Sequence, residues 1–296
     1  MAFQNSQFSL AYDRPSITMV SQPEIPFDRK SMPGHRTYFE TLCRVVSVAL
    51  EVLRSRMYPG SSQPTFQEIR EWKQRIQRIV AEATLHLRHR EHCQTLAQHI
   101  ERTELRLHSS YLLSVLCRVS LDPHAHLDPH RRALIREDCI SSLVNTVDAF
   151  VELHEINSHC SRSWISLQRS IASAFLLVSN DDNPKTWELI DRLEKVLADH
   201  VYADGDADHN NRTDSSKHLA SSLWAFREIR ESFRTRKDAP APPTLLPTPA
   251  TDADPEFPNR PTGSATPMDD WGMQHIIDQV SDVMLFPSMR GYSLAL

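Results

Sequence analysis

The sequence predicts an all-α protein: an irregular multi-helix bundle, then a disordered proline-rich linker and a short C-terminal amphipathic helix. Apolar residues recur at steps of three and four over most of the first 237 residues, which is the spacing of helix faces. No segment has a convincing strand pattern, and no fixed-period repeat is present. The chain has only 6 glycines against 19 prolines, which argues against an all-β fold and against a glycine-rich nucleotide-binding enzyme.

Composition excludes several classes of protein. The 296 residues allow one large or two ordinary domains. The net charge of −5 does not predict nucleic-acid binding through bulk charge. No apolar run approaches the length of a membrane span, and the first residues lack the order of a signal peptide. We therefore expect a globular protein that does not contact membranes.

The cysteines indicate a reduced protein. There are five, an odd number, and they are widely spaced. Four of them lie within apolar helical patterns, so we expect buried thiols in a reducing compartment rather than a disulfide framework. The five are Cys43, Cys93, Cys117, Cys139 and Cys160.

The first two helices have clear boundaries in the sequence. Residues 1–34 hold four prolines, which exclude a long helix, so we expect an extended segment on the domain surface. A helical pattern, with Phe39 among its apolar positions, starts at Arg36 and ends before Pro59. Thr65 and Glu68 then match a capping box, which predicts the start of a second helix.

Four further helices follow up to residue 203. A third is expected from Leu96 to Leu116, and a fourth has Pro129 in its first turn, with Leu134 among its apolar positions. The fifth, 160–180, is apolar or small on every side from 171 to 178, so we expect it to be the central buried helix. Asn183 and Pro184 mark the cap and first position of a sixth. A stripe of small residues on the fifth helix could admit another helix closely: Ser163, Ser166, Ser170 and Ser173.

The C-terminal third changes character. A polar loop over 204–214 precedes a seventh helix that we expect to start at Asp214 or Ser215. Nine of the 19 prolines fall between 240 and 267, so residues 238–268 are predicted to be a disordered linker. The tail, 269–296, mixes acidic and bulky apolar residues. It suits either a segment that folds on a partner or a helix that docks on its own bundle. Its candidate partner-binding residues are Trp271, Ile276, Ile277, Val280 and Met284.

The histidines and the His159–Cys160 pair give little sign of a metal or catalytic site. His86 and His89 are expected to share a helical face, but His92 turns away from them, and a zinc site needs a converging third ligand. A cysteine at the edge of a helix is more often inert than activated. No serine-hydrolase, metalloprotease or nucleotide-binding motif is present. We therefore expect no enzyme, no metal and no bound cofactor.

Two arginines on the fifth helix leave two interpretations open. Arg162 and Arg169 lie seven residues apart near the serine stripe. They could pair with acids on a neighbouring helix, for which Asp138, Asp148 and Glu152 are candidates. Alternatively, they could form an anion-binding pocket inside the bundle.

Several segments together resemble the middle homology region of fungal zinc-cluster transcription factors. SLAYDRPSIT with SQPEIPFD resembles its Gly-Arg-Pro segment, and residues 85–121 resemble its later helices. The resemblance runs in order over about residues 8–235. The family's Trp-x-x-Leu-Gln-Arg-x-x-x-x-Ala stretch is matched by Trp164, Leu167, Gln168, Arg169 and Ala174.

The resemblance implies a nuclear regulator of a metabolic gene set. It implies co-regulators or the transcription machinery as partners, with a homodimer and a small-molecule effector as further candidates. An effector or core polar site would include Arg162, Gln168 and Arg169. The family's DNA-binding module holds zinc with six cysteines, starting from a Cys-x-x-Cys pair. Here no such pair exists and residue 13 is Asp where the family usually has Gly.

We therefore expect a regulatory domain over 1–237, truncated at its N-terminus, that does not bind DNA specifically by itself. Zinc would belong only to the missing DNA-binding module. Two other functions stay open: a helical interaction module with no role at DNA, and an all-α enzyme with a buried site.

Overall fold

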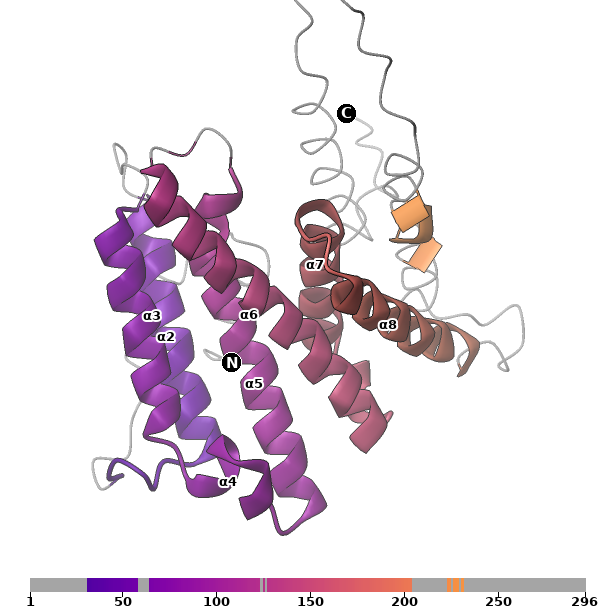
Figure 1. The fold of residues 1–296 in the computed structure, drawn as a ribbon. Coiled ribbons are helices and arrows are strands. Elements are labelled where there is room, and N and C mark those ends of the chain that lie inside the picture. The colour runs from indigo at the N-terminus through magenta and orange to yellow at the C-terminus, as the bar shows by residue number, and fades with distance from the viewer. Residues whose placement is uncertain are drawn as a thin grey trace, which may run out of the picture. The chain divides into compact units, whose positions relative to one another are not determined.

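A computed structural model describes residues 31–57, 64–122, 125 and 127–203, with single helical turns or less between 223 and 231. Within these ranges the chain is a packed bundle of α-helices joined by turns (Figure 1), so the predicted all-α class is confirmed. The extended pairing found there is one isolated bridge between Arg36 and Ala83. The predicted linker, tail and domain boundaries at 237 and 268 lie outside the described residues.

The first two helices lie where the sequence predicts them, with the first starting two residues later than expected. Helix α2 spans Tyr38–Met57 and helix α3 spans Phe66–Ala81. The capping box is complete: the Thr65 side chain accepts from the Glu68 amide, and the Glu68 carboxylate accepts from the Thr65 amide at 2.7 Å. Two orphan amides are thereby satisfied, which fixes the start of α3.

A short irregular stretch between α3 and α5 was not predicted. It contains helix α4 (Leu85–Arg88) and the 3₁₀ turn η2 (Arg90–His92), and it leads into the long helix α5 (Leu96–Cys117). Four and three residues are too few to show a helical period. Gly34, with φ of +87°, donates its amide to Glu82 O at 2.7 Å and so ties the entrance of α2 to the end of α3.

Helix α6 (Pro129–Ile156) is the longest helix of the described bundle. The Asp128 side chain caps it by accepting from two backbone amides, and proline occupies its first position, as predicted. It follows the 3₁₀ turn η3 (Arg118–Leu121) and packs mainly against α5, and also against α7 and α8. Among the described helices α5 contacts the most others, namely α2, α3, α4, α6 and α7, so the expectation that the fifth predicted helix is the central one is wrong.

The fifth helix is nevertheless buried, and it starts later than predicted. Helix α7 runs from Trp164 to Asn180, and Cys160–Arg162 forms a separate 3₁₀ turn, η4. The 3₁₀ turn precedes the Ser163 cap, so the pattern over 160–163 belongs to the connection. Three of the four stripe serines, Ser166, Ser170 and Ser173, are fully buried, whereas Ser163 is exposed.

Helix α8 (Pro184–Ala203) closes the described bundle. Asn183 caps it, as predicted, by accepting from the Lys185 amide at 3.1 Å. Helices α2 to α8 belong to the first of two units, residues 1–223 and 224–296. No helix in the described ranges is long and apolar enough to cross a bilayer.

Three residues placed on buried faces by their spacing are in fact exposed. Phe39, Leu96 and Leu134 are 60%, 57% and 45% exposed. Each lies in the first two turns of its helix. Spacing identifies the face of a helix but not where along its length a neighbouring helix begins to cover it.

Candidate functional site

The two arginines predicted to share a polar site are separated in the structure. Arg162 lies in η4 and is exposed, whereas Arg169 lies on α7 and is 1% exposed. The seven-residue spacing would align them only on one continuous helix, and α7 begins after Arg162. The two arginines therefore lie on different elements, one exposed and one buried.

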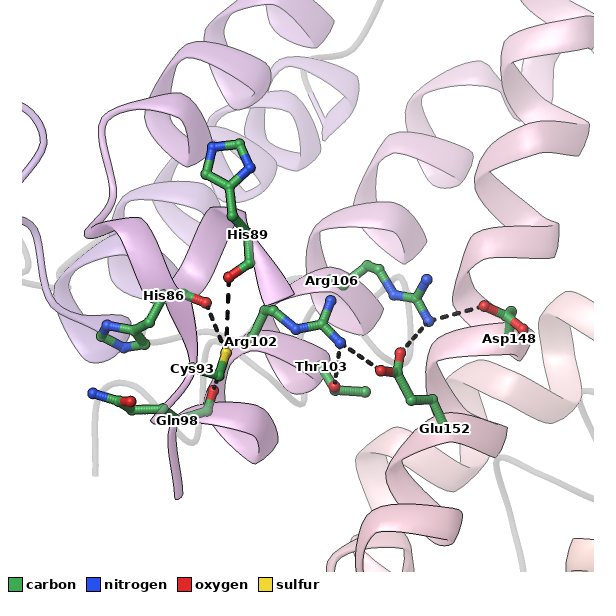
Figure 2. Close-up of polar contacts among 9 residues, drawn as sticks. All are labelled: His86, His89, Cys93, Gln98, Arg102, Thr103, Arg106, Asp148 and Glu152. Carbon is green, nitrogen blue, oxygen red and sulfur yellow. Dashed lines mark hydrogen bonds and ion pairs between the residues drawn. The ribbon is translucent and has the colours of Figure 1, made fainter. Parts of the chain in front are cut away.

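The three acids suggested as partners of these arginines pair with other basic residues. Asp138 pairs with Lys73 of α3, while Asp148 and Glu152 pair with arginines of α5. Arg106 contacts both Asp148 and Glu152, at 2.9 and 2.7 Å. Figure 2 shows Arg102 and Arg106 extending from α5 toward these two carboxylates of α6.

Arg169 instead joins a cluster of aromatic side chains in the core, which we call the Arg169 cluster: Tyr38, His108, Tyr111 and Arg169. Its Nη1 lies 2.6 Å from Nδ1 of His108, and its guanidinium carbon lies 5.0 Å from the centre of the Tyr111 ring. A planar guanidinium suits such stacking, which a lysine could not reproduce.

Electrostatics fix the protonation of this cluster. Burial lowers the pKa of His108 well below its usual value, and the charge of Arg169 lowers it further. Burial also lowers the pKa of Arg169 to about 10, so the guanidinium stays charged at neutral pH. His108 is therefore neutral, and its Nδ1 accepts the proton that Arg169 donates.

Tyr38 connects the Arg169 cluster to the rest of the bundle. Its ring packs against Leu42 and Leu87, and its hydroxyl donates to Oε2 of Glu104 at 2.8 Å. Burial, followed by the nearby Glu104 charge, raises its pKa. The cluster thus joins α2, α5 and α7 and has the character of a packed structural core.

Gln168, the third predicted site residue, is buried next to Arg169 on α7. Its Oε1 has no hydrogen-bond partner among the described residues, and the same is true of the hydroxyls of Ser166 and Ser173. Successive residues on a helix point about 100° apart, so Gln168 and Arg169 do not converge on one point. The candidate tail residues from Trp271 to Met284 lie outside the described residues.

A cavity of about 460 Å³ lies between α3, α4 and α5, and no sequence signal pointed to it. We call it the α3–α5 cavity. Polar side chains come from all three helices and the residue after α4: Gln77, Arg88, His89, Arg102, Arg106 and Ser109. Its apolar lining consists of Ile76, Val80, Ala81, Leu87, Leu105 and Leu113.

The wall of this cavity is held in place by Cys93. Its thiol lies 3.2 Å from the carbonyl oxygen of His86 and near those of His89 and Gln98, as Figure 2 shows. A thiol has one proton, so it donates to one carbonyl at a time. These contacts connect the segment of α4 and η2 to the start of α5.

The histidines of this stretch do not form a metal site. His89 caps the end of α4 with an extended backbone, so it does not share a helical face with His86, contrary to expectation. His86 contacts Glu101 at 3.3 Å and His89 contacts Glu91 at 3.8 Å. Over the described ranges, no three His, Cys, Asp or Glu side chains converge as metal ligands would.

The five cysteines are free thiols in the structure. Cys43, Cys117 and Cys139 are buried, as expected, and burial raises the pKa of Cys117 to about 12 and of Cys139 to about 11. Burial also raises the pKa of Cys160, so His159 beside it does not activate the thiol.

A serine between two histidines is a polar group that sequence reasoning missed. The Ser161 hydroxyl lies 2.9 Å from both His154 Nδ1 and His200 Nε2, and it donates to Ser158 O at 3.0 Å. Asp199 lies 3.7 Å from the other nitrogen of His154. Ser, His and Asp are the residue types of a hydrolase triad. Ser161 is fully buried, however, so no substrate can reach it.

This group instead cross-links the ends of α6 and α8 through η4. Because Ser161 donates its proton to Ser158, both histidine nitrogens that face it act as donors. Ser161 lies 7 positions after His154 and 39 before His200, a spacing that matches no motif, so only the fold reveals the group.

Comparison of the chain with protein-family models, with curated proteins and with solved structures finds no match in any of the three. The resemblance to the zinc-cluster transcription factors therefore stays a prediction from the sequence.

Proposed function

We propose that this chain is the regulatory part of a fungal zinc-cluster transcription regulator, acting in the nucleus with its DNA-binding module absent. The observation that best supports the proposal is the position of the resembling stretch. Trp164 to Ala174 lies on α7, where Leu167, Arg169 and Ala174 are all buried. Residues that carry the resemblance are thus core residues of an all-α domain.

A regulatory role also suits what the bundle offers chemically. The one Ser–His–Asp arrangement among the described residues is closed to substrate, and the cysteine thiols with raised pKa values are poor nucleophiles. A regulatory domain needs no reacting side chain, but it needs a core that can hold an effector. The α3–α5 cavity provides such a space.

A reporter assay tests this function. The full chain is fused to an unrelated DNA-binding domain and expressed in a fungal cell that carries the matching reporter gene. We expect reporter expression to change relative to the DNA-binding domain alone, and we expect the change to shrink when residues 269–296 are removed. The matched control replaces those residues with a glycine–serine segment of equal length.

Two outcomes would contradict the proposal. A fusion that is folded and nuclear but leaves the reporter unchanged would favour a helical interaction module with no role at DNA. Sequence-specific, zinc-dependent DNA binding by the unfused chain in a gel-shift assay would contradict the absence of a DNA-binding module.

A further inference from the structure

The charged side chains that line the α3–α5 cavity are all positive. Three arginines line it, Arg88, Arg102 and Arg106, and no Asp or Glu is among its lining residues in the described part of the chain. The carboxylates that balance Arg102 and Arg106 approach from α6 and do not line the cavity. The walls of the cavity therefore favour a negatively charged guest.

The three arginines also leave hydrogen-bond donors unused. The Nε of each is buried and has no hydrogen-bond acceptor among the described residues. Arg88 differs from the other two, because it has no ion pair or hydrogen bond with any residue in the described ranges. The buried Nε atoms are closed to solvent, so a ligand would bind through the terminal Nη groups, and those of Arg88 have no protein partner within the described ranges to give up.

Half of the lining residues are apolar. Ile76 and Val80 of α3 and Leu105 of α5 face the same cavity as the arginines. A volume of about 460 Å³ is within the range of small-molecule sites. A ligand that contacts both the arginines and the apolar residues needs a negatively charged head and an apolar body.

We propose that the α3–α5 cavity binds an amphipathic carboxylate, with the head on Arg88 and the apolar body against Ile76, Val80 and Leu105. A guanidinium can bind a carboxylate through two parallel hydrogen bonds, which gives the site its preference for this head group. The proposal names the class of ligand for the effector space described above, and its observations come from the cavity and not from a role in transcription.

Calorimetric titration of the full-length chain with decanoate tests the site. We expect saturable binding of one decanoate per chain and no binding of decyltrimethylammonium, which has the same apolar body and the opposite charge. Arg88→Met should weaken decanoate binding about 10- to 100-fold, the effect of losing one charge-assisted contact. Ala81→Trp, which fills the cavity from the end of α3, should abolish binding.

The matched control is Arg90→Met. It removes the same charge two residues away, from an exposed position that does not line the cavity, and should leave decanoate affinity unchanged. Circular dichroism and melting curves confirm that each variant is folded. The proposal is overturned if decanoate does not bind, if Arg88→Met and Arg90→Met bind it equally, or if decyltrimethylammonium binds as well. None of these results bears on the reporter assay, so the two proposals fail separately.

Discussion

The Arg169 cluster and the α3–α5 cavity are built from the same residue type and use it in opposite ways. Arg169 is 1% exposed, is held by His108 and Tyr111, and does not line the α3–α5 cavity. Arg88 lines that cavity, is partly exposed, and its side chain has no ion pair or hydrogen bond within the described ranges. Both side chains are at least partly buried, but of the two only Arg88 lines the cavity.

The difference shows that burial alone does not identify a binding arginine. A buried cation that stacks on rings and donates to a neutral histidine is a packing element, and its removal acts on stability. An arginine that lines a cavity and has no ion pair is expected to affect the affinity for a ligand in that cavity. Mutations that separate these two effects therefore test the comparison directly.

The largest effect should come from Arg169→Ala. The substitution leaves a cavity in the core and removes the donor to His108, so we expect the free energy of unfolding to fall by about 3–5 kcal/mol. Urea denaturation followed by circular dichroism measures it. Arg162→Ala is the matched control, because Arg162 is exposed, and it should change stability by less than about 0.5 kcal/mol. Equal losses in the two variants would show that Arg169 is not a core element.

A smaller effect is expected from Glu152→Gln, at the back of the α3–α5 cavity. Glu152 is the carboxylate shared by Arg102 and Arg106, so its loss should cost about 2 kcal/mol in chemical denaturation. Glu155→Gln removes an exposed carboxylate one turn away and should cost less than about 0.5 kcal/mol.

The same variant sharpens the comparison on the binding side. Without Glu152, the charges of Arg102 and Arg106 are less well matched, so decanoate should bind more tightly to Glu152→Gln than to the wild type. A variant that loses stability without gaining affinity would indicate that these two arginines do not contribute to the potential in the cavity.

The smallest effect concerns pH and the Arg169 cluster. The pKa of folded His108 is below its unfolded value, so stability is fully present above about pH 6.5 and is lost as pH falls, because the unfolded chain takes up the proton first. Between pH 6.5 and 5.5 this one group should cost up to about 1.4 kcal/mol. His108→Asn keeps an acceptor for Arg169 and should flatten the slope of stability against pH measured by urea denaturation. An unchanged slope would show that His108 is protonated when folded.

Local signals in the sequence predicted most of the helices. Thr65 with Glu68, Pro129, and Asn183 with Pro184 act over one turn of chain, so each marked a helix start correctly. The start of α7 was placed too early because a 3₁₀ turn continued its pattern.

The sites could not be predicted in the same way. Arg88 and Ile76 come from different helices, and nothing in their spacing shows that they face one cavity. Arg169 was singled out as a polar residue, but its partners His108 and Tyr111 lie about 60 positions earlier. Contacts between distant segments depend on how the helices pack, which composition and periodicity do not encode.

Helix α6 contacts both the cavity-lining helix α5 and the helices α7 and α8. Its 28 residues form a rod about 42 Å long that touches α5 along one side and α7 and α8 elsewhere. Glu152 and Asp148 join this rod to the arginines of α5, and tightly packed interiors transmit strain instead of absorbing it. A ligand that draws Arg102 or Arg106 away from α6 would therefore shift α6. Because α6 also packs against α7 and α8, such a shift would reach those helices as well.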